Sequence, residues 1–66
     1  MKRYVMVVEW RDYIKCIDSF NDHKVNYTCT AGSVDEAMGK AMSAYGDPGR
    51  SWVMRSGLVV TSIYSE

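Results

Sequence analysis

This 66-residue sequence has no long apolar run and no excess of charge of either sign. It contains one proline. No stretch approaches the roughly 20 apolar residues that a membrane-spanning helix needs. Met1-Lys2-Arg3 begins with charge, but Glu9 and Arg11 interrupt the apolar segment that follows too early for a secretory signal peptide. We therefore expect a cytoplasmic protein.

The charges of the chain are balanced, because eight basic residues are matched by eight acidic ones. Proteins that bind nucleic acids normally carry a basic excess, since neutralising phosphates supplies much of their affinity. The missing excess disfavours that class. A net charge of zero also favours self-association over mutual repulsion.

Cysteine and histidine are too few for a disulfide framework or a common zinc site. Cys16, His23 and Cys29 have the spacing C-x6-H-x5-C, which matches no common structural zinc motif. A thiol nucleophile would also need a nearby base and a third residue to orient it, which a single histidine does not supply. We expect no catalytic, cofactor or metal site, and hence no enzyme.

One domain over residues 1–66 is expected from the length, and 47% apolar residues are enough for a folded core. A helix is predicted from Val34 to Tyr45. Ser33 and Glu36 have the spacing of a capping box, and Pro48 cannot continue the helix. Apolar residues recur on one helical face: Val34, Ala37, Met38, Ala41, Met42 and Tyr45.

Three strands are predicted before this helix from their content of Val, Thr and aromatic residues: Tyr4–Trp10, Tyr13–Phe20 and Lys24–Ala31. Asn21-Asp22-His23 is the predicted turn between the second and third strands. This turn would bring Cys16 opposite Cys29, close enough for a disulfide, although a reducing cytoplasm would keep both thiols free.

The segment Ser51–Tyr64 is also rich in strand-forming residues, but Ser56-Gly57 interrupts it. It forms either a hairpin of two short strands or one long strand with a glycine bulge, and the hairpin is preferred. The predicted fold is therefore α+β. A small antiparallel sheet of four or five strands (β-β-β-α-β or β-β-β-α-β-β) carries one amphipathic helix on one face.

The junction Thr30-Ala31-Gly32-Ser33-Val34-Asp35-Glu36-Ala37 resembles the antitoxin subunit of HicAB toxin–antitoxin pairs. In that family strands lead into a helix that begins T-x-E-E-A. The family's Pro-Asp-Leu-Pro-Gly turn is absent here, so no functional residue is transferred from it.

One helix can cover only one face of a sheet, yet the first strand is apolar on both. Tyr4, Met6, Val8 and Trp10 alternate with Val5 and Val7, and the sequence leaves open which set meets the helix. Aromatic residues are frequent binding anchors. We expect these residues to bind a partner: Tyr4, Met6, Val8, Trp10 and Trp52.

The expected function is that of a small protein-interaction domain. It would bind or block a partner protein, or form a homodimer, through the sheet face that the helix leaves uncovered. Small inhibitors, antitoxins and phage accessory proteins are analogies for this mode of action. The alternative is a module that binds single-stranded nucleic acid with aromatic and basic strand residues such as Tyr13, Lys15 and Arg11.

Overall fold

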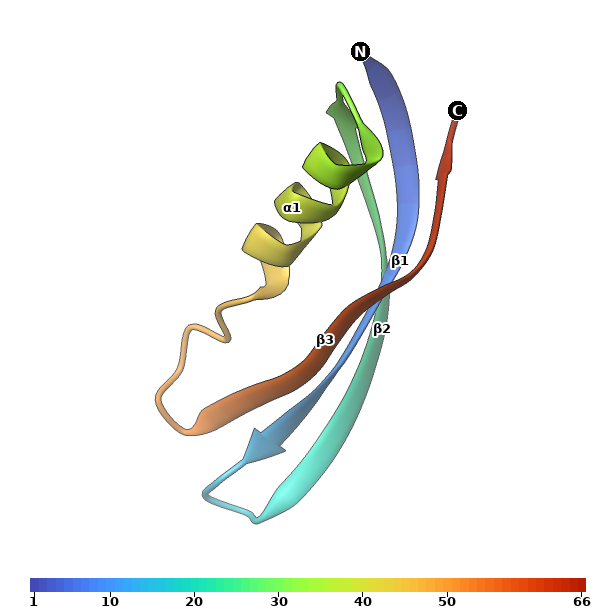
Figure 1. The fold of residues 1–66 in the computed structure, drawn as a ribbon. Helices are drawn as coiled ribbons and strands as arrows, with labels where there is room; N and C mark the ends of the chain where they lie inside the picture. Colours follow the sequence, from blue (N-terminus) through green and yellow to red (C-terminus); the bar gives the residue numbers. More distant parts are fainter.

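The computed structural model describes residues 1–66 as a three-stranded antiparallel sheet with one helix on one face (Figure 1). The elements along the chain are β1 (Lys2–Ile14), β2 (Ser19–Ala31), α1 (Val34–Tyr45) and β3 (Val53–Ser65). The strand order is β2-β1-β3, so β1 is the central strand and β2 and β3 are the two edges of the sheet. The predicted α+β class is confirmed, whereas the predicted four or five strands are in fact three.

The first hairpin turns earlier than predicted, because β1 continues to Ile14 and the turn is formed by residues 15–18. Asp18 adopts a left-handed backbone conformation with φ of 48°, which aspartate tolerates better than most residues. Its carboxylate accepts a hydrogen bond from the Tyr13 hydroxyl. The predicted turn at Asn21–His23 is wrong, since these residues lie within β2 and pair with Trp10–Asp12.

Moving the turn separates the two cysteines. Cys16 is exposed in the hairpin turn, whereas Cys29 is half-buried on β2 opposite Tyr4, near the other end of the hairpin. The predicted cross-strand pairing of Cys16 with Cys29 is therefore wrong. Both thiols are free.

The segment after the helix is one 13-residue strand, so the preferred hairpin is wrong and the glycine-bulge alternative is correct. Gly57 has φ of 67°, a conformation that glycine adopts without a steric cost. At this point the register of β3 against β1 shifts between Glu9 and Arg11. The bulge adds one residue to β3, and it lets both ends of the strand stay paired with β1.

The predicted helix at Val34–Tyr45 is confirmed. The Ser33 Oγ accepts a hydrogen bond from the Glu36 amide at 3.2 Å, and the Glu36 Oε2 accepts one from the Gly32 amide at 2.7 Å. Ala37 and Ala41 are completely buried, so small side chains let α1 approach the sheet closely. Met42, by contrast, is 40% exposed, so the apolar helical stripe is only partly covered.

The hydrophobic core is small and lies between α1 and the sheet. Only eight of the 66 residues are buried, in a molecule whose long axis spans 43 Å. The apolar ones come from β1, the end of β2 and α1: Tyr4, Met6, Val8, Trp10, Ala31, Ala37 and Ala41. The opposite face of the sheet carries no layer of its own chain (Figure 1). A candidate binding surface is therefore sought on that face.

Candidate functional site

Four of the five residues predicted to bind a partner belong to the core instead. Tyr4, Met6, Val8 and Trp10 face α1 and are at most 8% exposed. They cannot meet a partner in this fold. These four residues alternate along β1, so they point to the same face of the sheet and form an uninterrupted apolar set. The residues that point to the other face include Glu9 and Arg11. Burying the apolar set therefore costs less free energy than burying the other. Trp52 lies outside the core and is 47% exposed.

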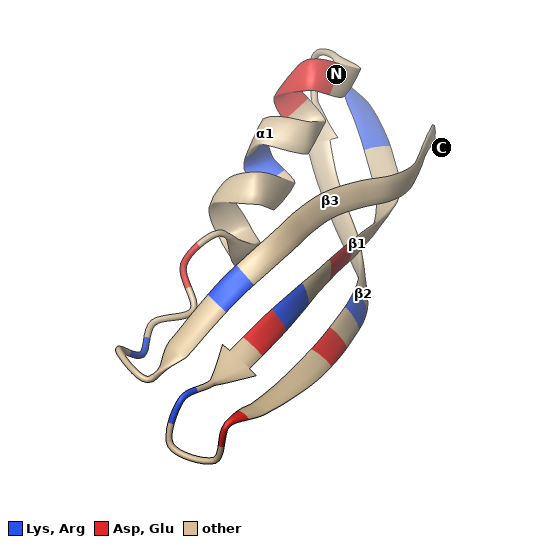
Figure 2. Cartoon of the chain, turned by 60° about the horizontal axis from the view of Figure 1, so that its bottom comes forward, with Lys and Arg blue, Asp and Glu red and all other residues tan.

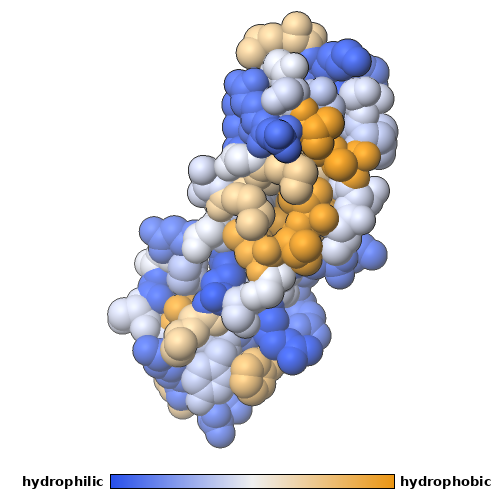
Figure 3. All heavy atoms as spheres, viewed as in Figure 1, coloured by the Kyte–Doolittle hydropathy of each residue, from blue (hydrophilic) through white to orange (hydrophobic).

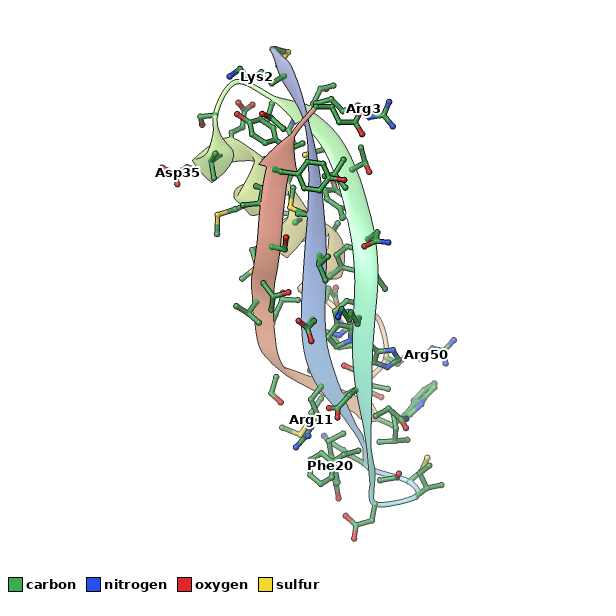
Figure 4. The ribbon with its side chains drawn as sticks, turned by 90° about the vertical axis from the view of Figure 1, so that its right-hand side faces the viewer. Lys2, Arg3, Arg11, Phe20, Asp35 and Arg50 are labelled. Carbon is green, nitrogen blue, oxygen red and sulfur yellow. The ribbon has the colours of Figure 1, made fainter.

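The uncovered side of the sheet, which we call the open face, is defined by the pairing of the strands. Residues directly opposite each other in antiparallel strands point to the same side. On β1 the open face consists of Arg3, Val5, Val7, Glu9, Arg11 and Tyr13, with their partners on β2 and β3. Figure 4 views this face, with Arg3 near one end and Arg11 and Phe20 near the other.

Three large side chains form a row across all three strands near the hairpin end of the open face. Phe20 on β2 pairs with Tyr13 on β1, which in turn pairs with Met54 on β3. We call these three residues the tip row. Phe20 is 62% exposed and Met54 is 55% exposed, and the Tyr13 and Phe20 rings lie 4.9 Å apart between centroids. The tip row therefore presents a continuous band of apolar and aromatic surface to the solvent.

A second apolar area lies toward the other end of the open face. Val5 pairs with Tyr64, and Glu9 pairs with Val59. A register shift of β3 lies between these two pairs. Tyr64 is 59% exposed and Val59 is 48% exposed. The open face thus carries two apolar areas, separated by polar side chains.

The polar region between the two apolar areas of the open face is organised by an ion pair between β1 and β2. The Arg11 Nε donates to the Asp22 Oδ1 at 2.7 Å, and the Arg11 Nη2 donates to Oδ2 at 3.2 Å. This hydrogen-bonded pair raises the pKa of Arg11 and lowers the pKa of Asp22. The guanidinium also lies 5.7 Å from the centre of the Phe20 ring. Arg11 is thus held in place beside the tip row.

A shallow hollow of about 440 Å³ lies beside this ion pair, and its lining includes Trp10 and His23 of the helix side as well as residues of the open face. One of its seven lining residues is hydrophobic, Trp10, and most of the others are charged or polar: Glu9, Trp10, Arg11, Asp22, His23, Ser56 and Gly57. Pockets for small molecules are usually lined mostly by apolar side chains. The hollow therefore lacks the apolar lining that is typical of a small-molecule site.

On the helix side, a buried ion pair joins the C-terminal part of β1 to the N-terminal part of β3. Asp12 is 5% exposed and accepts hydrogen bonds from the Arg55 Nε at 2.8 Å and the Arg55 Nη2 at 3.1 Å. The Arg55 Nη1 donates to the Tyr45 carbonyl at 2.6 Å, in the last turn of α1, which has no basic residue of its own. Arg55 therefore links β1 to the helix end, where a positive charge is favourable.

Aromatic rings cover this ion pair. The Trp10 ring is stacked on His23 at 5.2 Å and on Tyr45 at 5.1 Å, and the Arg55 guanidinium carbon lies 4.6 Å from the Trp10 ring centre. The His23 Nε2 is 3.4 Å from the Asp12 Oδ2. Asp12, Arg55 and Trp10 are thus a structural cluster that anchors the end of α1.

The Asp12 carboxylate should make the stability of the fold sensitive to acid. Hydrogen bonds from Arg55 lower the pKa of Asp12, although its burial acts in the opposite direction. A pKa below that of the unfolded chain, about 4, contributes stability above that pH, which is lost as the pH falls through the folded-state pKa. We expect the urea midpoint to decrease steadily below about pH 4. Asp22→Asn should retain most of this loss, because Asp22 is exposed; a midpoint independent of pH would contradict the role of Asp12.

No group of three His, Cys, Asp or Glu side chains is placed to hold a metal ion. The potential ligands His23 and Cys29 lie six residues apart on β2, while Cys16 is in the hairpin turn. No helix of the chain is both long enough and apolar enough to cross a membrane. The chain matches no protein family, no curated protein and no solved structure.

Proposed function

We propose that this protein is a non-enzymatic interaction domain that binds a partner protein through the open face. The tip row is the observation that carries the proposal. Phe20 and Met54 are both more than half exposed and stand in register with Tyr13, although an isolated domain gains nothing by presenting them to water. Exposed apolar areas of this kind mark interaction sites. Binding there would act by covering a surface of the partner.

The charges around the tip row favour a protein over a nucleic acid. Arg11 is already bound by Asp22, and Glu9 stands opposite Lys24. Figure 2 shows both signs of charge interspersed along β1 and β2. A phosphate backbone laid across this face would meet these carboxylates, whereas a partner protein can match both signs. Single-stranded nucleic acid remains the second candidate because of the aromatic residues Tyr13 and Phe20.

The proposal predicts that the double variant Phe20→Thr/Met54→Thr loses its partner. Threonine keeps the strand propensity of both positions, and exposed substitutions change stability little. Tagged wild type and variant are compared by capture from an extract of the producing cells, followed by quantitative mass spectrometry. We expect at least one protein held by the wild type to be reduced about tenfold or more in the variant, because anchor residues carry most of the binding energy.

Val34→Thr is the matched control, since Val34 is 44% exposed but lies on α1, away from the open face. It should retain the partner. Equal recovery by the wild type and the double variant would contradict the proposal. Bound material that is nucleic acid, with affinity falling steeply as salt increases, would support the second candidate instead. A Trp52→Thr variant tests whether that exposed tryptophan adds to binding.

A further inference from the structure

The two edges of the sheet differ in regularity. The register of β3 against β1 shifts twice, between Val7 and Val8 and between Glu9 and Arg11. Apolar atoms gather between α1 and β3 (Figure 3), but the backbone edge beside them is this irregular one. β2, by contrast, pairs with β1 from Ser19 to Ala31 without a shift. Bulges protect an edge strand against pairing with another chain, so the regular β2 edge is the one suited to receive a further strand.

The direction of the backbone groups of β2 follows from the contacts of β1. The Arg3 carbonyl accepts a hydrogen bond from the Glu66 amide at 2.8 Å, so the backbone groups of Arg3 point toward β3. Thr30, which pairs with Arg3, therefore directs its own N–H and C=O groups away from β1, out of the sheet edge. Every second residue of β2 shares this direction: Phe20, Asp22, Lys24, Asn26 and Thr28. The backbone of another extended strand is the partner that such a row of donors and acceptors fits.

The helix closes one end of this row. The Lys40 Nζ donates to the Thr30 carbonyl at 2.6 Å, so that carbonyl already has a partner within the chain. The same end of β2 is covered by α1, whose Ala37 carbonyl lies 4.0 Å from the Cys29 Sγ. The part of β2 that is nearer the hairpin turn is therefore the free part of the edge.

The charges of this free part match those of a second copy of the chain in one register. If two β2 strands pair antiparallel about His23, Asp22 of each copy stands opposite Lys24 of the other. Registers centred on Asp22 or on Lys24 would instead place like charges opposite each other. Lys24 forms no ion pair within its own chain, although it stands opposite Glu9 on β1. Since Asp22 is bound by Arg11, the four charges in each row across the joined sheets alternate in sign.

We propose that two copies of this chain pair along their β2 edges, antiparallel and related by a two-fold axis at His23, and so form one continuous sheet. An interface of this symmetry pairs a surface with itself. Phe20, Asp22, Lys24 and Asn26 of each copy exchange backbone hydrogen bonds with the same four residues of the other, about eight bonds in all. These bonds supply affinity. The two Asp22–Lys24 pairs fix the register, because charge complementarity contributes specificity more than affinity.

This pairing fits the rest of the fold. It joins residues 19–27 of both copies over roughly 30 Å, at about 3.4 Å per residue, in a molecule whose long axis is 43 Å. Thr30, whose carbonyl is held by Lys40, falls outside the paired segment, opposite the hairpin turn of the other copy. The half-buried Val25 and Tyr27 gain cover from the neighbouring strand. The two α1 helices lie over opposite ends of the joined sheet, so they do not collide.

The test is sedimentation equilibrium of the full chain at increasing micromolar concentrations. We expect the wild type to approach twice the 7.5 kDa of one chain. Asp22→Lys and Lys24→Asp each place two pairs of like charges in the interface, so each should raise the dissociation constant about tenfold or more. An equimolar mixture of the two variants should form a mixed dimer, because every lysine at these positions then faces an aspartate. Native mass spectrometry identifies the mixed dimer by its mass.

A second variant tests the backbone pairing without changing any charge. Asn26→Pro removes one outward N–H group from an edge strand, where proline is tolerated, and should also weaken the dimer about tenfold or more. Asn26→Ala retains the N–H group and is its matched control. Asp35→Lys is the control for charge, since it makes the same change as Asp22→Lys at an exposed position of α1. Both controls should dimerise as the wild type does, and circular dichroism checks that every variant is folded.

Three results would overturn the proposal. The first is a mass of 7.5 kDa for the wild type at every concentration. The second is a dimer that is unaffected by the folded variants Asp22→Lys and Asn26→Pro. The third is a mixture of Asp22→Lys and Lys24→Asp that stays monomeric while the wild type dimerises. Phe20→Thr/Met54→Thr keeps the β2 backbone and should still dimerise, so this proposal and the proposed function fail independently.

Discussion

Asp12→Asn is expected to lower the free energy of unfolding by about 3–5 kcal/mol, the usual cost of removing one partner from a buried ion pair. The Arg55 side chain is 15% exposed, so its charge would remain in a poorly hydrated site without the carboxylate that now accepts two hydrogen bonds from it. The Arg55 bond to the Tyr45 carbonyl would also be weakened, and with it the end of α1.

Urea titration followed by circular dichroism measures this effect. Asp22→Asn is the matched control, because Asp22 also forms a bidentate pair with an arginine but is exposed, and exposed pairs contribute little. Equal losses in the two variants would show that burial of the Asp12–Arg55 pair has no special role. A loss of unfolding free energy in Asp12→Asn alone would show that the cluster of Asp12, Arg55 and Trp10 stabilises the fold.

Met6→Ala is expected to cost about 2–5 kcal/mol, because Met6 is completely buried at the centre of the sheet under α1. Met42→Ala should cost much less, since that side chain is 40% exposed. The helical periodicity alone predicts that Met38 and Met42 anchor the helix in the core. The structure moves this role to Met6 and to the alanines Ala37 and Ala41.

The comparison of Met6→Ala with Met42→Ala uses the same substitution in both positions, so the difference in urea midpoint reports burial directly. Similar losses in both variants would contradict the assignment of the core.

The helix is the element that the sequence predicts best. Its limits are encoded locally, by Ser33 and Glu36 at the start and by Pro48 beyond the end, and no long-range contact opposes these signals. The confirmed bounds Val34–Tyr45 follow from that agreement. The extent of helix burial is not local, because it depends on where Lys40 and the core fasten α1 to the sheet.

The turn of the first hairpin could not be predicted from local signals. Asn21-Asp22 is a stronger turn pattern than Lys15–Asp18, but Asp22 is held in the sheet by Arg11 across the strands. The tight turn instead uses the left-handed conformation of Asp18, supported by Tyr13. The cross-strand partners depend on the register of β1 against β2, and no local sequence signal specifies that register.

The sequence predicts that one face of the sheet is uncovered, but it does not predict which residues form that face. A single helix implies one uncovered face, yet which parity of β1 is buried depended on residues far along the chain. Asp12 shares the buried parity only because Arg55, 43 residues later, neutralises it. Glu9 and Arg11, which mark the other parity as exposed, were the available signal. The tip row was missed because it requires the true pairing of Tyr13 with Phe20 and Met54.

Photo-crosslinking from position 20 tests most directly whether the open face binds a partner protein. A photoreactive phenylalanine analogue replaces Phe20 in one sample and Val34 in another, and both are irradiated in an extract of the producing cells. We predict a discrete crosslink to another protein from position 20, with none to that protein from position 34. Crosslinks to that protein only from position 34, or only to a second copy of the chain from position 20, would contradict the proposed function.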